Sequence, residues 1–410
     1  MHHTTPLITT IVAGLVFAFL FGALATRLRL PPLVGYLFAG IFIGPFTPGY
    51  IADLTIAPQL AELGVILLMF GVGLHFSLDD LLSVKSIAIP GAVVQIAIAT
   101  VLGIFLALGF GWPIGEGFVF GLCLSTASTV VLLRAMQERN LLESFQGKIA
   151  VGWLIVEDMA MVITLVLLPP LAGLLGGKDP QLEIGSTKTL SEILITLAIT
   201  IGKVLAFIAF MLGVGRKAIP WLLHRIVKTG NTELFRLSVL AIALGIAYGS
   251  SILFDVSFAL GAFFAGMVLA ESEFSHRAAD ETLPFRDAFA VLFFVSVGML
   301  FNPDTLFQEP LAVFGTFLII VFGKSIVAFG IVLSFKHPVK TAFTISASLA
   351  QIGEFSFILA GLGRELHLLT EESHAIILAG AILSILVNPL LFAALGRING
   401  RLPKEPEPIL

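Results

Sequence analysis

The sequence predicts an all-α membrane protein with about thirteen transmembrane helices. Of its 410 residues, 57% are hydrophobic and only 12% are charged, and the mean hydropathy is +1.03. A soluble domain is about half apolar and about a quarter charged, so this composition excludes an ordinary globular surface. The formal net charge of -4 excludes the basic surface that nucleic acid requires. The single cysteine excludes an internal disulfide.

Apolar stretches of membrane-spanning length recur along the whole chain. Each crossing of a hydrocarbon core of ~30 Å needs roughly 20 such residues, and Gly, Pro and charged residues separate the stretches. The predicted spans are 6–25, 32–45, 57–75, 86–110, 114–135, 148–173, 190–214, 232–251, 256–271, 285–301, 310–335, 340–362 and 372–396. The first span follows no basic segment and precedes no small-residue cleavage site, which favours a retained span over a signal peptide.

The positive charges support this division. With an external N-terminus, 18 of the 23 Lys and Arg residues fall in cytoplasmic loops, whereas Lys203 and Lys324 lie inside spans. Membrane proteins carry their excess of Lys and Arg in cytoplasmic loops, so we predict the N-terminus outside and the C-terminus in the cytoplasm. An odd number of spans also permits two inverted six-helix repeats, spans one to six and eight to thirteen, with the seventh as a link.

The most informative charges are the adjacent acids Glu157 and Asp158, inside an otherwise apolar span. A charge at the bilayer centre costs about 2.5–3.5 kcal/mol or more. Counting from Lys148 at ~1.5 Å per residue places Asp158 about 15 Å deep, near the midplane. Neighbouring side chains on a helix point ~100° apart, so one acid is expected to face an ion pathway while the other meets a partner. The alternative is a buried acid pair that only ties helices together.

Lys324 is the matching charge of opposite sign, in the centre of the span 310–335. An ion pair with Glu157 or Asp158 would offset the cost of burying both charges. The alternative for Lys324 is a purely structural salt bridge. Lys203 lies nearer the outer part of its span and is interpreted as structural, and Asp255 lies at a span boundary where helix capping explains it.

Polar residues interrupt two further spans at membrane depth. The segment 124–130 contains four hydroxyl side chains, Ser125, Thr126, Ser128 and Thr129, and the segment 346–355 contains Ser348, Gln351 and Glu354. Irregular backbone at this depth is tolerated only where it is buried in protein or lines a cavity, and half-helix ends there hold ions. Hydroxyl and carbonyl oxygens with the Asp158 carboxylate suit a hard alkali cation. The alternative is small-residue helix packing with Ser and Thr bonded to their own helices.

Several motifs together resemble one known family over essentially the whole chain. They are the segments 61–74, 124–129, 157–158, 293–299 and 353–355. These segments resemble the Kef-type branch of the monovalent cation:proton antiporters, in the cation:proton antiporter-2 superfamily. The resemblance implies an NhaA/NapA-like antiporter fold with two crossed discontinuous helices, here 114–135 and 340–362. It also implies that Asp158 is the essential aspartate and Lys324 the family's membrane lysine.

The resemblance also implies a domain organisation. The transmembrane domain would cover residues 1–396, with core elements at about 86–173 and 310–396 that move against dimerisation elements at about 6–45 and 190–271. Gated members carry a cytosolic nucleotide-binding domain after the last helix, so we interpret the tail 397–410 as cytoplasmic and truncated before such a domain. A homodimer in the bacterial inner membrane is expected. Glutathione control is not carried over, because the loop 275–284 only partly follows that of the gated members. Glu157 stands where gated members have Gln, so the resemblance does not fix the transported ion or the proton stoichiometry.

These observations predict a secondary transporter that exchanges a monovalent cation for protons by alternating access. K⁺ is favoured and Na⁺ is possible, and ion and proton are expected to compete at Asp158. Two alternatives are a gated K⁺ channel or uniporter on the same scaffold, which a missing filter-like motif opposes, and a small-solute or drug exporter coupled to protons. No cofactor is expected. We find no nucleophile–base pair, metal cluster or cofactor motif that would indicate an enzyme.

Overall fold

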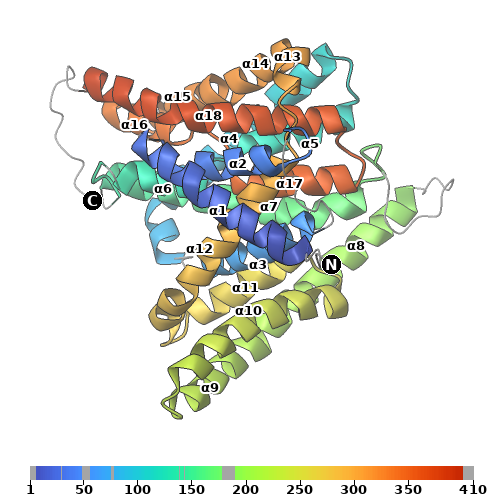
Figure 1. Ribbon diagram of the computed structural model, residues 1–410, viewed down its shortest axis with the longest axis vertical. Helices are drawn as coiled ribbons and strands as arrows, with labels where there is room; N and C mark the ends of the chain where they lie inside the picture. The colour runs from blue at the N-terminus through green and yellow to red at the C-terminus, as the bar shows by residue number, and fades with distance from the viewer. Residues whose placement is uncertain are drawn as a thin grey trace.

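The computed structural model describes residues 6–28, 30–48, 56–74, 78–137, 139–142, 144–177 and 190–399, and these residues are nearly all helical (Figure 1). Within this part of the chain, nine helices are long and apolar enough to cross a membrane. Three shorter apolar helices accompany them, Pro32–Ile43, Ile114–Ser125 and Phe258–Ala270. The predicted all-α membrane class is therefore confirmed.

The first half of the chain forms seven helices. They are α1 (Pro6–Arg27), α2 (Pro32–Ile43), α3 (Ala57–Leu74), α4 (Leu78–Gly109), α5 (Ile114–Ser125), α6 (Thr129–Gln137) and α7 (Phe145–Leu171). Each predicted span in this half coincides with one helix, except that 114–135 is divided into α5 and α6.

The second half contains two π-helical segments, η1 and η2, within longer helical runs. Its elements are α8 (Leu190–Phe210), η1 (Met211–Gly215), α9 (Arg216–Val227), α10 (Thr232–Phe254), α11 (Phe258–Ala270), α12 (Ser275–Met299), α13 (Thr305–Gln308), α14 (Pro310–Leu318), η2 (Ile319–Gly323), α15 (Lys324–Ser334), α16 (Val339–Ser348), α17 (Glu354–Glu365) and α18 (Glu371–Asn399). The predicted span 340–362 is divided into α16 and α17.

Two predicted boundaries are wrong. The span 190–214 does not end there, because the run continues through η1 and α9 to Val227. The segment 275–284, interpreted as a loop, is the first part of α12. There, Arg277 lies 4.3 Å from the centre of the Phe235 ring on α10, and Glu281 pairs with Arg236. Hydropathy identifies only the part of a helix that lies in lipid. The contacts of Arg277 and Glu281 with α10 accompany the extension of α12 beyond that part.

Small residues allow the helices to approach closely. A side chain at Gly103 on α4 would overlap the backbone of Gly121 on α5, and one at Gly73 on α3 would overlap α11 near Gly266. Helices in membranes associate through such small residues because lipid supplies no hydrophobic driving force between them. The contact between Gly103 and Gly121 packs α5 directly against α4. The end of α5, at Ser125, therefore lies beside Gln95 of α4.

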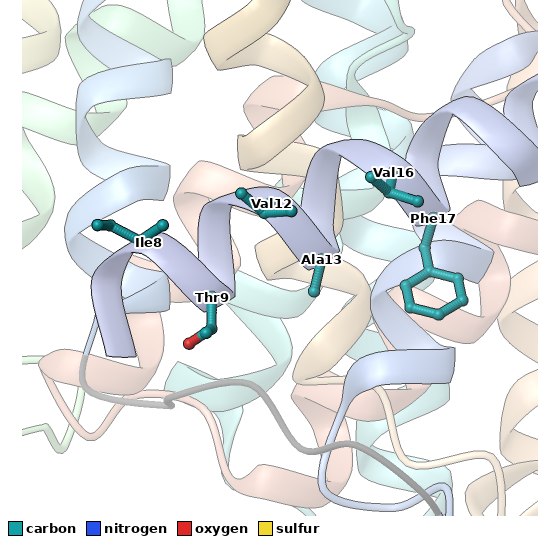
Figure 2. A pocket seen from close by; sticks show the side chains of 6 residues that line it. All are labelled: Ile8, Thr9, Val12, Ala13, Val16 and Phe17. Atoms are coloured by element: carbon teal, nitrogen blue, oxygen red, sulfur yellow. The ribbon is translucent and has the colours of Figure 1, made fainter. Parts of the chain in front are cut away.

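The helix α1 has one packed face and one open face. Its buried residues recur about every fourth position: Thr10, Gly14, Ala18, Gly22 and Ala25. The open face carries a shallow apolar groove, whose lining side chains Figure 2 shows: Ile8, Thr9, Val12, Ala13, Val16 and Phe17. Such a surface suits lipid or another apolar helix. The assignment of 6–45 to dimerisation remains a prediction.

Candidate ion site at the crossing of two broken helices

Two helices are interrupted by short non-helical segments in the interior of the protein. The first break separates α5, which ends at Ser125, from α6, and Thr126 has extended angles there (φ -99, ψ 139). The second break, residues 349–353, separates α16 from α17. Each break leaves backbone N–H and C=O groups without the partners that a continuous helix provides. Both breaks fall within the polar segments singled out in the sequence.

Gln351 joins the two breaks. Its Oε1 accepts a hydrogen bond from the backbone N–H of Ser128 (2.8 Å), and its Nε2 donates to the Ser128 carbonyl (3.1 Å). The Ser128 hydroxyl also donates to Glu354 Oε2 at 2.8 Å. Gly353 lies so close to Ser128 that a Cβ at this glycine would overlap the serine side chain. The two broken helices therefore cross in direct contact, as the family resemblance implied.

Glu157, on α7, stabilises the first break. The side chain is 0% exposed. Its Oε2 accepts a hydrogen bond from the backbone N–H of Ala127 (2.7 Å), and its Oε1 accepts one from Gln95 Nε2 (2.5 Å). Both carboxylate oxygens therefore have donors within the protein. An ionised carboxylate suits this position because hydrogen bonds to charged acceptors are stronger than neutral ones.

Asp158 differs from its neighbour in having an unused oxygen. Its Oδ2 accepts a hydrogen bond from Thr129 Oγ1 at 3.1 Å, whereas its Oδ1 is buried and has no hydrogen-bond partner among the described residues. Thr129 is the first residue of α6, so Asp158 lies beside the positive end of a half-helix dipole. The two adjacent acids thus meet different surroundings, as their angular separation on the helix predicted.

Lys324 does not form the direct ion pair that the sequence suggested. The side chain is 1% exposed, and its Nζ donates a hydrogen bond to the backbone carbonyl of Gln351 at 3.1 Å. The ion pairs among the described residues do not join it to Glu157 or Asp158. The carbonyls past the C-terminus of α16 form the negative end of that half-helix, so they bind the ammonium group in place of a carboxylate.

The other predicted hydroxyls have different roles. Ser125 Oγ donates to the Leu122 carbonyl of its own helix, and Ser348 Oγ donates to Thr344 in the same way, both at 2.7 Å. These two bonds fit the alternative interpretation, in which the hydroxyls only bond carbonyls of their own helices. Thr126 Oγ1 lies 3.3 Å from Ser356 Oγ, on the other broken helix. Of the other five residues predicted around the cation, Thr129 is the one that bonds the Asp158 carboxylate, through Oδ2, the oxygen that is not open.

Sequence reasoning missed Gln95, on α4. Its side chain is 0% exposed, and its Nε2 lies 3.4 Å from the Ser125 carbonyl as well as 2.5 Å from Glu157. Its Oε1 has no hydrogen-bond partner among the described residues. An amide in the middle of a long apolar helix is costly to bury unpaired, and this signal would have identified it.

A second missed amide supports the other break. Asn388, on α18, donates a hydrogen bond from Nδ2 to the carbonyl of Ala347 at 2.8 Å. It lies directly before Pro389 in the sequence, and its side chain is buried. Both breaks therefore use an amide from a neighbouring continuous helix to satisfy a carbonyl near the end of a half-helix.

The chemistry of the crossing is that of hard oxygen ligands. Within the described residues, no group of three His, Cys, Asp or Glu side chains is placed to hold a metal ion. The hydrogen bonds of the crossing involve carboxylate, hydroxyl, amide and backbone oxygens. Such ligands suit an alkali cation, whereas transition metals favour imidazole or thiolate.

Comparisons with known proteins identify the family. The model of the sodium/hydrogen exchanger transmembrane family matches residues 15–397. The putative cation/proton antiporter YbaL of Escherichia coli K12 is 64% identical over 395 residues, which cover 96% of this chain and 69% of that protein. The K(+) efflux antiporter 4 of Arabidopsis thaliana is 32% identical over 364 residues, 88% of this chain and 59% of that protein.

A solved structure supports the fold alone. The sodium proton antiporter MjNhaP1 from Methanocaldococcus jannaschii has a TM-score of 0.63 at 18% identity, over 95% of this chain and 99% of that one. The likeness extends over nearly the full length of both chains, so it includes the crossed helices. Together with the Kef-type motifs, these matches show that the chain belongs to the sodium/hydrogen exchanger family of cation/proton antiporters and is a transporter rather than an enzyme.

Proposed function

We propose that this protein exchanges a monovalent cation, K⁺ in preference to Na⁺, for protons, and that the two ions compete for Asp158. The observation that carries the proposal is the buried Asp158 Oδ1 without a hydrogen-bond partner among the described residues. The preference for K⁺ is supported by the printed name of the Arabidopsis relative, a K(+) efflux antiporter.

The geometry supports competition because one oxygen of Asp158 is held and the other is open. Thr129 orients the carboxylate through Oδ2. Oδ1 keeps its lone pairs free for a cation, because the Thr129 hydrogen bond is made to the other oxygen. A proton on Oδ1 removes the charge that holds the cation, so each ion displaces the other. Movement of the core elements against the scaffold would then expose the site to alternate sides.

The balance of buried charges also supports a bound cation. Glu157, Asp158 and Glu354 are each at most 5% exposed, and Lys324 is the buried positive charge at the same crossing. Three ionised carboxylates with one ammonium group leave excess negative charge in a region where burial of charge is costly. A cation, or protons in its absence, would neutralise that excess.

The decisive test is the variant Asp158→Asn in proteoliposomes. It keeps the size of the side chain but removes the charge, so cation-dependent dissipation of an imposed pH gradient should fall at least about 100-fold, as expected when a cation loses its only charged ligand. Asp255→Asn is the matched control, because Asp255 is exposed and pairs with Lys203 away from the crossing. Unchanged exchange in Asp158→Asn would refute the proposed site.

A cation titration would define the substrate and the coupling. Proton flux should rise with K⁺ at lower concentration than with Na⁺, and a clamped membrane potential should reveal any net charge moved per cycle. We expect Glu157→Gln to alter the charge moved per turnover, because it removes a buried negative charge beside the site. Equal half-saturation by both ions would contradict the K⁺ preference.

We further propose the assembly that the family resemblance implied and the orientation that the positive charges predicted. These are a homodimer in the bacterial inner membrane, with the N-terminus outside and the C-terminus cytoplasmic. Because Cys123 is the single cysteine and is buried, single cysteines introduced into loops of a Cys123→Ala variant would report their side of the membrane. Labelling of Lys336→Cys by an impermeant reagent from the outside would contradict this orientation.

A further inference from the structure

The helical run from α8 to α9 is longer than a membrane is thick. It comprises 21 residues in α8, 5 in η1 and 12 in α9, which makes about 57 Å at ~1.5 Å per residue. Several large apolar side chains between Ile195 and Val214 are exposed, and the one Lys of this stretch, Lys203, is 42% exposed and pairs with Asp255. That stretch is about 30 Å long, the thickness of the hydrocarbon core. A hydrocarbon core that begins near Ile195 would end at η1 and leave α9 in the headgroup region.

The composition of α9 suits that position. Its sequence, RKAIPWLLHRIV, is amphipathic, with Ile219 and Leu223 buried against the protein. On its exposed surface, Lys217, Trp221, Arg225 and Lys228 follow one another at intervals of four, four and three residues. Residues so spaced share one face of a helix. Trp221 is 57% exposed, and Trp is enriched where a membrane meets water. We name these four residues the α9 stripe.

The cations of the α9 stripe are available for a ligand. Three acids of the neighbouring segments contact other residues, Glu271 with Arg216 (2.9 Å), Glu273 with His224 (3.5 Å) and Glu281 with Arg236, whereas Glu233, at the start of α10, is exposed. Lys217, Arg225 and Lys228 form no ion pair with any described residue. Arg225 lies over the Trp221 ring at 4.5 Å from its centre, so its guanidinium is held beside the indole. Figure 1 shows α9 at one end of the molecule, away from the crossing helices.

We propose that the α9 stripe binds the phosphate of an anionic phospholipid in the adjacent leaflet. The basic side chains would contact the headgroup while Trp221 and its exposed neighbour Leu222 contact the upper part of the acyl chains. Charge complementarity favours an anionic over a zwitterionic lipid. Binding here would anchor α8 and α10, which flank α9 in the chain, at a fixed depth.

The test is native mass spectrometry of the full chain purified in detergent, with dioleoyl phosphatidylglycerol or the phosphatidylcholine of the same chains. The wild type should retain phosphatidylglycerol preferentially. A basic side chain near an anionic surface contributes roughly fivefold to binding, so K217Q/R225Q should lower the affinity about thirtyfold. K336Q/K340Q is the matched control, because both lysines are exposed and lie elsewhere, Lys336 in the turn before α16 and Lys340 at the start of that helix. This readout is independent of ion exchange, so its failure leaves the ion site untouched.

Two results would overturn the proposal. The wild type would retain the two lipids equally, or K217Q/R225Q and K336Q/K340Q would lose the same affinity for phosphatidylglycerol. Competition by excess inorganic phosphate would also overturn it, because it would indicate a site for soluble anions. If K217Q/R225Q does not fold, brominated phosphatidylglycerol provides a second measurement. It should quench wild-type fluorescence more than brominated phosphatidylcholine does, and W221F should remove that difference. A difference that persists in W221F would contradict binding at α9.

Discussion

The two breaks have the same form but are stabilised by opposite charges. At the first break, the donors at the start of α6 bind acidic side chains. The backbone N–H of Ala127 donates to Glu157, and the hydroxyl of Thr129 donates to Asp158. At the second break, the carbonyl of Gln351, just beyond α16, meets the positive Lys324. Acids at the positive end of a helix and a cation at the negative end are the favourable arrangement in both cases.

The two breaks differ in whether a polar atom is left without a hydrogen-bond partner. At the second break, Lys324 and Asn388 satisfy the carbonyls of Gln351 and Ala347. At the first break, the Asp158 Oδ1 is left over. At the second break, the ammonium group of Lys324 supplies a permanent positive charge. In the proposed function, an exchangeable cation would supply it at the first break. The following predictions test this asymmetry, from the largest expected effect to the smallest.

Addition of one methyl group at Gly353 should disrupt the contact between the two breaks. In Gly353→Ala, the new Cβ would overlap Ser128, and overpacking of this kind costs about 1–3 kcal/mol, at times more. We expect the upper end of this range, with loss of exchange, because both partners are buried. Thermal unfolding in detergent measures the effect. Gly361→Ala, on the same half-helix α17 with open space around it, is the control, and equal stability of the two variants would contradict the crossing geometry.

Lys324 is expected to act mainly through the second break. Lys324→Met removes the donor to the Gln351 carbonyl and should cost about 1.5–3 kcal/mol of stability, the range for a hydrogen bond to a charged group. The control Lys203→Met breaks an exposed pair with Asp255 (3.0 Å) and should cost under about 1 kcal/mol. A Lys324→Met protein with unchanged thermal stability but a greatly altered half-saturating K⁺ concentration would instead favour a direct partnership with the acids.

Gln95 should matter for exchange more than for stability. Gln95→Met keeps the length of the side chain but removes the donor to Glu157, so the first break loses one of its supports. We expect about a tenfold lower exchange rate, equivalent to ~1.4 kcal/mol. Gln146→Met is the control, since Gln146 lies on the same helix as Glu157 but bonds Thr341 weakly at 3.4 Å. Equal rates in the two variants would show that Gln95 is not required.

The smallest effect is expected at Thr126. Its hydroxyl makes a long contact with Ser356 (3.3 Å) and no hydrogen bond to either acid. Thr126→Val preserves the shape and should cost less than about 1 kcal/mol, with exchange within about twofold of wild type at that cost. A large loss of exchange in proteoliposomes, comparable with that of Asp158→Asn, would move the ion site toward α17.

Much of the site could be predicted because charge is so costly in a membrane. Glu157, Asp158 and Lys324 stand out in apolar spans, and the polar segments around Ser128 and Gln351 mark the breaks. Pairing could not be predicted, because it depends on which groups face each other across helices distant in sequence. Lys324 therefore binds a carbonyl rather than an acid. Gln95 was overlooked since an uncharged amide in an apolar helix is a weaker signal than a charge.

Composition and the spacing of apolar residues by themselves determined that the chain is a helical membrane protein, and the isolated charges led to the proposal of an ion site at Glu157 and Asp158. Only the tertiary structure decided that Glu157 is fully hydrogen-bonded while Asp158 keeps an open oxygen. The physical reason is that burial cost is a property of each residue in its own span, whereas hydrogen-bond satisfaction depends on partners that α4, α5 and α6 bring from elsewhere in the chain.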